Sequence, residues 1–389
     1  MAVWAPIGEG RGAYDRRMPT DGPLIELNAR PEPRPVLLDG DDGVTRAATG
    51  ARVAALVAHP PALVLTSSCS AALDTSAALL DLGPGDEVVV PAFTFPTSAS
   101  PFLARRAAVR FADVDPVAAS VTAETVAAVL TERTRAVVLT HYAGIGIDLA
   151  SLGDLLAERG IDVVEDAAHG LFASLDDRPL GRLGRFGCLS FHRTKNVSAL
   201  DGGALLVNRE DDVAAALVAV DKGTNRVAFD EGRVRSYEWM GMGTSARMSE
   251  GSLHLLAAEL DRAGAIQDRR RAVEARYQEA LSPWADERGI GWPRPQPGRR
   301  SPAHIAHLVL PAAEVRDAFV AHCAAAGVQA VRHYGSLPES GYGRTIRHPD
   351  DTCPVAARLA DCLVRLPLHH QLSESDVDRV IDAVRSFPG

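Results

Sequence analysis

Two lysines stand out among the residues that could do chemistry, because this chain otherwise uses arginine as its cation. Lysine and arginine together number 41, yet only Lys195 and Lys222 are lysines. Lysine is normally one of the commonest residues, and either cation serves on a solvated surface. A guanidinium stays protonated at every physiological pH, whereas an amine can lose its proton. The two retained lysines are therefore candidates for chemistry that arginine cannot do, although chance retention also explains either one taken alone.

A carboxylate and a phosphate-binding turn are the partners expected for such an amine. "VVEDAAHG" (163–170) ends an apolar run with Asp166, and "TSSCSAAL" (66–73) places small residues where a helix begins. Free N–H groups at a helix N-terminus bind phosphate, although plain helix capping explains each motif alone. Pyridoxal phosphate (PLP) uses all three features, because it needs an amine for its aldehyde, an acid for its ring nitrogen and a cradle for its phosphate. Phe95 is placed to cover its ring.

An alternation of apolar runs with helix-like stretches predicts the sheet that must position these residues. The expected strands are 62–66, 86–91, 107–114, 135–142, 161–168, 187–192 and 202–208, with helices at 122–131 and 150–159. Continuous β-branched runs are typical of strands covered on both faces, which favours an α/β fold with a mostly parallel sheet. Ligands of such sheets bind beyond the carboxyl ends of the strands. Asp166 and Lys195 both follow a predicted strand.

The character of the sequence changes after residue 245. A long, interrupted helical region and a Pro/Gly/Arg-rich stretch precede strands at 304–310 and 328–334, a helix at 313–326 and two terminal helices. We therefore expect a large cofactor-binding α/β domain over 1–260, including an N-terminal segment 1–40, and a smaller α+β domain over 261–389.

The stretch 62–210 resembles the DegT/DnrJ/EryC1/StrS sugar aminotransferases, a family of fold-type I PLP enzymes. The pieces that carry the resemblance are "PGDEVVVPAFTF", "FADVDP", "HYAG", "VVEDAAHG", "GRLGRFGCLSFHRTKN" and "DGGALLVN", in the family's order. "KGTNRVAFDEGRVRSYEW" (222–239) is similar to the branch that aminates C4 of a dTDP-4-keto-6-deoxyhexose. With "RLPLHHQLSESDVDRVI", the resemblance covers about residues 24–385.

The resemblance implies a role for several residues around the cofactor. Lys195 matches the Schiff-base lysine and Asp166 the partner of the pyridine nitrogen. The ring-stacking aromatic falls at Phe95, and the cofactor's 3-hydroxyl falls beside His169, where many relatives have glutamine. Either side chain can form a hydrogen bond at that position, although a structural histidine is the ordinary alternative. The phosphate contacts fall at Ser70, Ala71 and Ser190.

Other positions implied by the resemblance concern the substrate and a second subunit. The "GTSARMSE" stretch (243–250) resembles the segment that reaches into the partner's site; Ser245 replaces the usual Asn, and Arg247 could take over its phosphate contact. Asn225 and Arg226, together with Lys222, are candidates to touch a phosphate or carboxylate of the substrate, whereas a surface lysine is the alternative for Lys222. His333 and Tyr334 follow the family pattern, but its second histidine is Pro338 here.

The implied activity is transfer of an amino group from L-glutamate to a nucleotide-linked keto sugar, by a homodimer with shared active sites. The favoured conversion is that of dTDP-4-keto-6-deoxyhexose to the 4-amino-4,6-dideoxy sugar, with the cofactor cycling between PLP and its pyridoxamine form. A 3-keto-sugar aminotransferase remains open. A sugar dehydratase is less favoured because that activity goes with histidine in place of the lysine. A non-catalytic PLP-binding regulator would be expected to lack Lys195 or Asp166.

Composition bounds the remaining possibilities. The 389-residue chain has a formal net charge of −9 and no basic block, which disfavours nucleic acid or an anionic membrane as its partner. No stretch reaches the roughly 20 apolar residues of a membrane span, and the N-terminus lacks the apolar core of a secretory signal. Five scattered cysteines predict free thiols in a reducing cytoplasm. The pairs His304/His307 and His369/His370 lack companion ligands, so we expect no metal.

Overall fold

A seven-stranded sheet forms the centre of the computed structural model, which describes residues 24–30 and 45–389. All seven strands predicted between residues 60 and 210 join this sheet, in the order β1-β9-β8-β5-β4-β2-β3. Strands β8, β5, β4, β2 and β3 run parallel, whereas β9 is antiparallel to both β1 and β8. The predicted α/β fold with a mostly parallel sheet is therefore confirmed. The strands are β1 (Ala62–Thr66), β2 (Glu87–Pro91), β3 (Ala108–Ala112), β4 (Thr134–Thr140), β5 (Asp162–Asp166), β8 (Phe186–Ser190) and β9 (Gly203–Val207).

Helices surround this sheet and begin where the sequence supplies capping side chains. Ser68 caps α2 by accepting a hydrogen bond from the Ala71 N–H, and Thr122 forms a capping box with Thr125 at α4, as expected for hydroxyl side chains at helix starts. The helices are α1 (Arg46–Leu56), α2 (Cys69–Ala78), α3 (Ser100–Ala104), α4 (Ala123–Ala127), α5 (Gly153–Glu158), α6 (Val213–Val220), α7 (Arg226–Asp230) and α8 (Glu250–Leu260). Short 3-10 helices lie at Pro96–Ser98, Tyr142–Gly144, Ala150–Leu152 and Glu210–Asp212.

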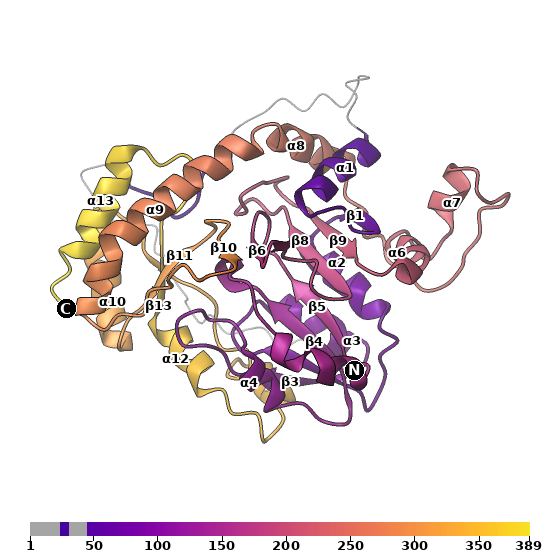
Figure 1. Ribbon diagram of the computed structural model, residues 1–389, viewed down its shortest axis with the longest axis horizontal. Coiled ribbons are helices and arrows are strands. Elements are labelled where there is room, and N and C mark those ends of the chain that lie inside the picture. Colours follow the sequence, from indigo (N-terminus) through magenta and orange to yellow (C-terminus); the bar gives the residue numbers. More distant parts are fainter. Residues whose placement is uncertain (1–23, 31–44) are drawn as a thin grey trace.

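The long helix α9 (Ala263–Glu287) follows a break after α8 and leads to the second sheet, as Figure 1 shows. That sheet consists of β11 (Ala306–Val309), β13 (Leu363–Leu366) and β12 (Val331–Arg332), in this order. Its helices are α10 (Ala313–Ala325), α11 (Gly343–Ile346), α12 (Pro354–Cys362) and α13 (Glu374–Arg385). A third small sheet joins β10 (Arg299–Arg300), β6 (Ser174–Leu175) and β7 (Arg178–Pro179).

The expected domain division at residue 260 stays a prediction. Residues before and after this position contact each other in two places. The largest apolar core joins strand residues such as Val89 with Ile305 and Leu363 from the C-terminal part. Residues 24–30 belong to the segment expected with the large domain, yet the Ile25 N–H donates to the Gly327 carbonyl at 2.8 Å. The rest of that segment, at 1–23 and 31–40, lies outside the described residues.

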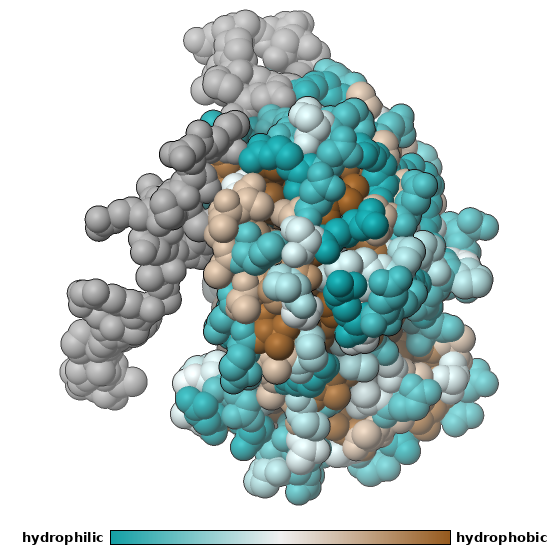
Figure 2. Space-filling model, turned by 90° about the vertical axis from the view of Figure 1, so that its left-hand side faces the viewer, coloured by the Kyte–Doolittle hydropathy of each residue, from teal (hydrophilic) through white to brown (hydrophobic). Residues whose placement is uncertain are grey.

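The exterior of the described part is mixed in polarity. Figure 2 shows the face beside α9 and α13, where hydrophilic side chains surround small apolar patches. Within residues 24–30 and 45–389, no helix combines the length and the apolar composition that crossing a bilayer requires. All five cysteines are free, as predicted.

Candidate active site

A cleft of about 990 Å³, counting the space at its open mouth, lies beyond the carboxyl ends of β1, β4, β5 and β8. Parallel strands end at one edge of a sheet, so side chains that follow different strands converge there. Residues from the C-terminal part of the chain line it from the other side, namely His304, His333, Tyr334 and Arg365. The residues that line it are Ser68, Cys69, Ser70, Phe95, Thr97, Thr140, Asp166, Ala168, His169, Ser190, His192, Thr194, Lys195, Asp201, His304, His333, Tyr334 and Arg365.

Asp166 is the buried carboxylate of the cleft, with 4% of its surface exposed. The Ser98 hydroxyl donates to Asp166 Oδ2 at 2.6 Å, and the Ala168 N–H donates to Oδ1 at 3.2 Å. A chain of hydroxyl contacts, from Ser98 to Thr94 and from Thr94 to Thr140, supports Ser98 from behind. Both oxygens of the carboxylate are therefore held by donors, which fixes its orientation.

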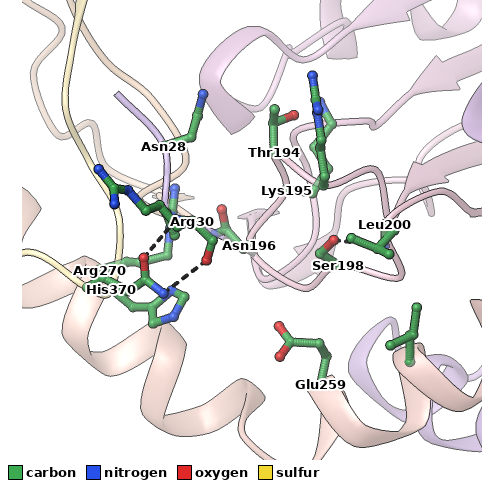
Figure 3. Close-up of a pocket in the computed structure, with 14 residues that line it drawn as sticks. Asn28, Arg30, Thr194, Lys195, Asn196, Ser198, Leu200, Glu259, Arg270 and His370 are labelled. Carbon is green, nitrogen blue, oxygen red and sulfur yellow. Dashed lines mark hydrogen bonds between the residues drawn. The ribbon is translucent and has the colours of Figure 1, made fainter. Parts of the chain in front are cut away.

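Lys195 lies in a turn after β8, where its own N–H donates to the His192 carbonyl at 2.8 Å. Burial lowers the pKa of its amine to about 8, although the Cys69 thiol and Asp166 act in the opposite direction. A lysine pKa near 8 leaves a useful neutral fraction near neutral pH, which a general base needs. Figure 3 shows the other side of this turn, where Asn196 lies near Arg270 while Lys195 points away from them.

The N-terminus of α2 forms one wall of the cleft. The first amides of a helix have no acceptor within the helix, and Cys69 and Ser70 occupy these positions. A Cβ at Gly203 would lie 2.4 Å from the Cys69 nitrogen, so only glycine on β9 lets the helix approach this closely. Ser190 lines the same cleft. Ala71 does not, and its N–H already donates to Ser68 Oγ at 3.1 Å.

Aromatic side chains make the opposite wall. Phe95 stands at the mouth with 50% of its surface exposed, which leaves a ring face open for stacking. Tyr334 adopts a φ of 53° and stacks on His333 at 3.8 Å between ring centroids. His333 Nδ1 is hydrogen-bonded to the Tyr142 hydroxyl at 2.8 Å.

His169 offers the cleft a hydrogen-bond donor. The Ala143 N–H donates to its Nδ1 at 3.2 Å, so the proton of the neutral ring must sit on Nε2. Burial, with a further contribution from Lys195, holds the pKa of His169 well below its usual value. The ring is therefore neutral near neutral pH.

The structure does not bring every residue of the sequence prediction to this cleft. Asn225 and Arg226 do not line the cleft. They belong to an arm, residues 222–245, that extends away from the sheet and carries α7 (Figure 1). The Asn225 amide closes this arm through Ser236 and Glu238, at 2.9 and 2.8 Å. Arg247 forms an ion pair with Asp221 at 2.8 Å and lines a different pocket.

Lys222 belongs to the same region and not to the cleft. Its side chain is 55% exposed and its Nζ lies 3.4 Å from Asp221 Oδ1. It follows the end of α6, as expected for a surface lysine near a helix terminus.

Three residues in or directly behind the cleft were not recognised as site residues in the sequence. Ser98 holds Asp166 from a short 3-10 helix, and Arg365 enters the cleft from β13. His304 was considered only as a metal ligand. Its Nδ1 bonds to Asn196 at 2.8 Å, and His307 Nε2 donates to the Val117 carbonyl at 2.8 Å, so the two rings serve different partners. Among the described residues no group of three or more His, Cys, Asp or Glu side chains is placed to hold a metal ion.

The side chains of the cleft fit pyridoxal phosphate. A fixed carboxylate, a partly neutral lysine and an exposed aromatic face at Phe95 lie in one cavity with the unbonded amides of a helix N-terminus. These supply, in that order, a partner for a protonated ring nitrogen, an amine for the aldehyde, a stacking surface and a phosphate cradle.

Comparisons with known proteins also indicate an aminotransferase. The family model described as the DegT/DnrJ/EryC1/StrS aminotransferase family matches residues 45–385. The chain is 30% identical over 311 residues to UDP-N-acetyl-3-dehydro-alpha-D-glucosamine 3-aminotransferase of Acidithiobacillus ferrooxidans, which covers 79% of each protein.

Two solved structures extend the comparison to the fold. The aminotransferase TlmJ of Streptoalloteichus hindustanus superposes with a TM-score of 0.78 at 32% identity, over 88% of this chain and 90% of TlmJ. Spr1654 of Streptococcus pneumoniae, solved in a PLP form, shares the fold with a TM-score of 0.79 at 22% identity, over 88% of this chain and 90% of its own. The chain therefore belongs to the DegT/DnrJ/EryC1/StrS aminotransferase family, and it is a PLP-dependent sugar aminotransferase.

Proposed function

We propose that this enzyme transfers the amino group of L-glutamate to the keto carbon of a nucleotide-linked deoxy sugar, with dTDP-4-keto-6-deoxyhexose as the favoured acceptor. The observation that carries the proposal is that Lys195, Asp166 and the N-terminus of α2 line one cleft, together with residues from the C-terminal part of the chain. Bound PLP supplies an aldehyde that exchanges amino groups and a protonated ring that withdraws electrons from the reacting carbon.

Lys195 has two tasks in this proposal. Its amine would hold the cofactor in the resting enzyme. Once the amino-acid donor has displaced this amine, the amine would take a proton from the donor's α-carbon and deliver a proton to C4′ of the cofactor. The pKa of about 8 supports the second task, because a base works best when its pKa is close to the working pH. In the amination of the sugar the same proton transfers run in the reverse order.

Asp166 keeps the ring nitrogen protonated, and its two donors hold its oxygens in place. His169 donates its Nε2 proton to the cofactor's 3-hydroxyl oxygen. Phe95 covers one ring face, while Ser70, Ser190 and the first amides of α2 receive the phosphate.

The position of the keto group is the finer part of the proposal. The stretch 222–239 resembles enzymes that aminate C4 of a dTDP sugar. A second candidate is amination at C3, and the specific observation in its favour is the relative of Acidithiobacillus ferrooxidans, whose name describes a UDP-linked 3-keto substrate.

We also propose a homodimer in which the arm 222–245 of one copy completes the cleft of the other. The arm carries several of the most exposed apolar side chains in the described part of the chain, including Trp239 at 77% and Met242 at 87%. Exposed patches of this kind are typical of interaction sites. In the dimer, Asn225, Arg226 and Arg247 would contact the substrate or the cofactor phosphate of the second copy, while His333 and Tyr334 serve the sugar from within the same chain. The free cysteines favour a reducing compartment, the cytoplasm.

A substrate panel tests the proposal. The purified enzyme with PLP and L-glutamate is offered dTDP-linked and UDP-linked sugars with the keto group at C3 or C4, and the products are identified by NMR. We expect a 4-amino product from the dTDP-linked 4-keto sugar. A product from the 3-keto sugars alone would replace the C4 proposal by the C3 candidate, and no amination of any keto sugar would overturn both.

A further inference from the structure

Two histidines lie side by side in the wall of the cleft, and each is anchored through the same ring atom. The ring centroids of His169 and His304 are 4.6 Å apart. His169 is held through Nδ1 by the Ala143 N–H, and His304 is held through Nδ1 by Asn196 Oδ1 at 2.8 Å. Both rings line the cavity that contains Lys195. The Nε2 atom of each ring is therefore the one left for a ligand.

The hydrogen-bond partners of Asn196 decide which tautomer His304 adopts. The Asn196 amide nitrogen donates to the Pro302 carbonyl at 2.7 Å and to Gln267 Oε1 at 3.0 Å. A carbonyl can only accept, so the atom that faces Pro302 must be the NH2 group. Asn196 therefore presents its oxygen to His304, and His304 Nδ1 must donate. The proton of His304 sits on Nδ1, and Nε2 keeps its lone pair.

Hydrogen bonds from a side chain of α9 also hold the backbone around His304. Arg270 donates to the Ala303 carbonyl and to the His304 carbonyl, each at 2.9 Å. Ala303 is buried with a φ of 49°, a conformation that costs free energy for a residue other than glycine and persists only where its surroundings hold it. The position of the ring is therefore set by side chains behind the cleft, of which Figure 3 shows Asn196 and Arg270.

Both rings are neutral. Burial holds the pKa of His304 well below its usual value, and the nearby His169 and Lys195 act in the same direction. The cleft thus presents one donor, His169 Nε2–H, beside one acceptor, His304 Nε2. The proposed function uses the donor for the cofactor and leaves the acceptor unused.

We propose that His304 Nε2 accepts a hydrogen bond from a hydroxyl group of the acceptor sugar, and that it thereby recognises the sugar and not the amino-acid donor. A hydroxyl beside the reacting carbonyl can give a hydrogen, which a neutral imidazole lone pair accepts. The carboxylates of glutamate can only accept, so this lone pair offers them no hydrogen bond. The inference rests on the proposed sugar substrate.

The test separates the two half-reactions of the holoenzyme. With His304→Phe, we expect the reaction of the PLP form with L-glutamate, followed by absorbance, to change less than about threefold. The reaction of the pyridoxamine form with the keto sugar should slow roughly 10- to 100-fold, as expected when a substrate hydroxyl loses its partner. His322→Phe makes the same chemical change on α10, outside the cleft, and should slow neither.

A second variant and a spectroscopic measurement keep the test independent of folding defects. Asn196→Asp still accepts from His304 Nδ1, but its charge favours a protonated ring and removes the lone pair, so we expect the same selective loss. Nitrogen NMR of histidine-labelled enzyme should show His304 protonated on Nδ1 only. Equal slowing of both half-reactions, no slowing in either, or a proton on Nε2 would each overturn the inference. Failure of the unaltered enzyme to aminate any keto sugar would instead overturn the proposed function, and the NMR result would still decide the tautomer.

Discussion

Lys195 and Lys222 are the same residue type in two different surroundings. Lys195 lies within a cleft, where burial lowers the pKa of its amine to about 8. Lys222 lies at the base of an arm, mostly exposed and paired with Asp221. The difference shows that an amine becomes a useful base through loss of water and placement near a reacting group, and not through its identity alone.

The largest expected effect separates the two lysines directly. Lys195→Arg keeps a cation but removes the amine that the proposed function uses as nucleophile and base, so we expect kcat to fall by at least about a thousandfold. Lys222→Arg keeps the ion pair with Asp221 and should stay within about twofold. Steady-state rates of sugar amination measure both. Comparable losses in the two variants would remove the distinction between the lysines.

The partner carboxylate gives the next largest effect. Asp166→Asn removes the carboxylate that, in the proposed function, keeps the ring nitrogen protonated, and we expect a loss of roughly 100-fold in kcat. Ser98→Ala leaves the charge but removes the 2.6 Å hydrogen bond to Oδ2, so its loss should be smaller, about tenfold. If Ser98→Ala proved as damaging as Asp166→Asn, orientation and not charge would be the main contribution of this pair.

The arm that begins at Lys222 supplies the third prediction. The double variant Trp239→Ser with Met242→Ser removes exposed apolar surface, so we expect a weaker dimer and about tenfold lower activity in dilute enzyme. Sedimentation and activity as functions of protein concentration measure this. Tyr342→Ser removes an exposed aromatic outside the arm and serves as the control. A monomeric unaltered enzyme with full activity would contradict the shared site.

The smallest effect concerns stability without cofactor. Folding lowers the pKa of Lys195 from 10.5 to about 8, so between these values the unfolded chain binds a proton that the folded chain lacks. The cost of burying the amine is therefore complete below pH 8 and disappears as the pH rises to about 10.5. Lys195→Met should raise the Tm by about 2–4 °C at pH 7.

The comparison across pH provides the control for that prediction. The Tm advantage of Lys195→Met should shrink steadily between pH 8 and pH 10, measured by calorimetry of cofactor-free protein. Lys222→Met makes the same change at a side chain that is 55% exposed and serves as the control. An advantage of Lys195→Met that is independent of pH would point to packing and not to the buried charge.

Much of the fold could be predicted from local sequence. Runs of β-branched residues identified all seven strands of the main sheet, and β1 ends at Thr66 as expected. The predicted strand at 328–334 is shorter than expected, with only Val331 and Arg332 paired to β13. Tyr334 has a positive φ, which directs the chain out of the strand toward the cleft, and residue type alone did not indicate this.

The residues of the candidate site also fall into those that could be predicted from the sequence and those that could not. Lys195 and Asp166 could be found because each directly follows a strand of one sheet, and the resemblance then gave each a role. Ser98 and Arg365 could not be found, because nothing in the sequence around either residue marks it. Ser98 contacts Asp166 across 68 residues of chain, and Arg365 lines the cleft with Lys195, from which it is far apart in the sequence.

By itself, the sequence determined that an amine, a carboxylate and a phosphate cradle would meet at one edge of a parallel sheet, because local hydrophobic patterning specifies strands and strand order brings their ends together. Only the tertiary structure decided the electrostatic properties of these groups and of the histidines beside them. Burial lowers the pKa of Lys195, and Asn196, which donates to Gln267 and Pro302, fixes the tautomer of His304. These properties depend on contacts between distant segments, and no local pattern encodes the dielectric surroundings that such contacts create.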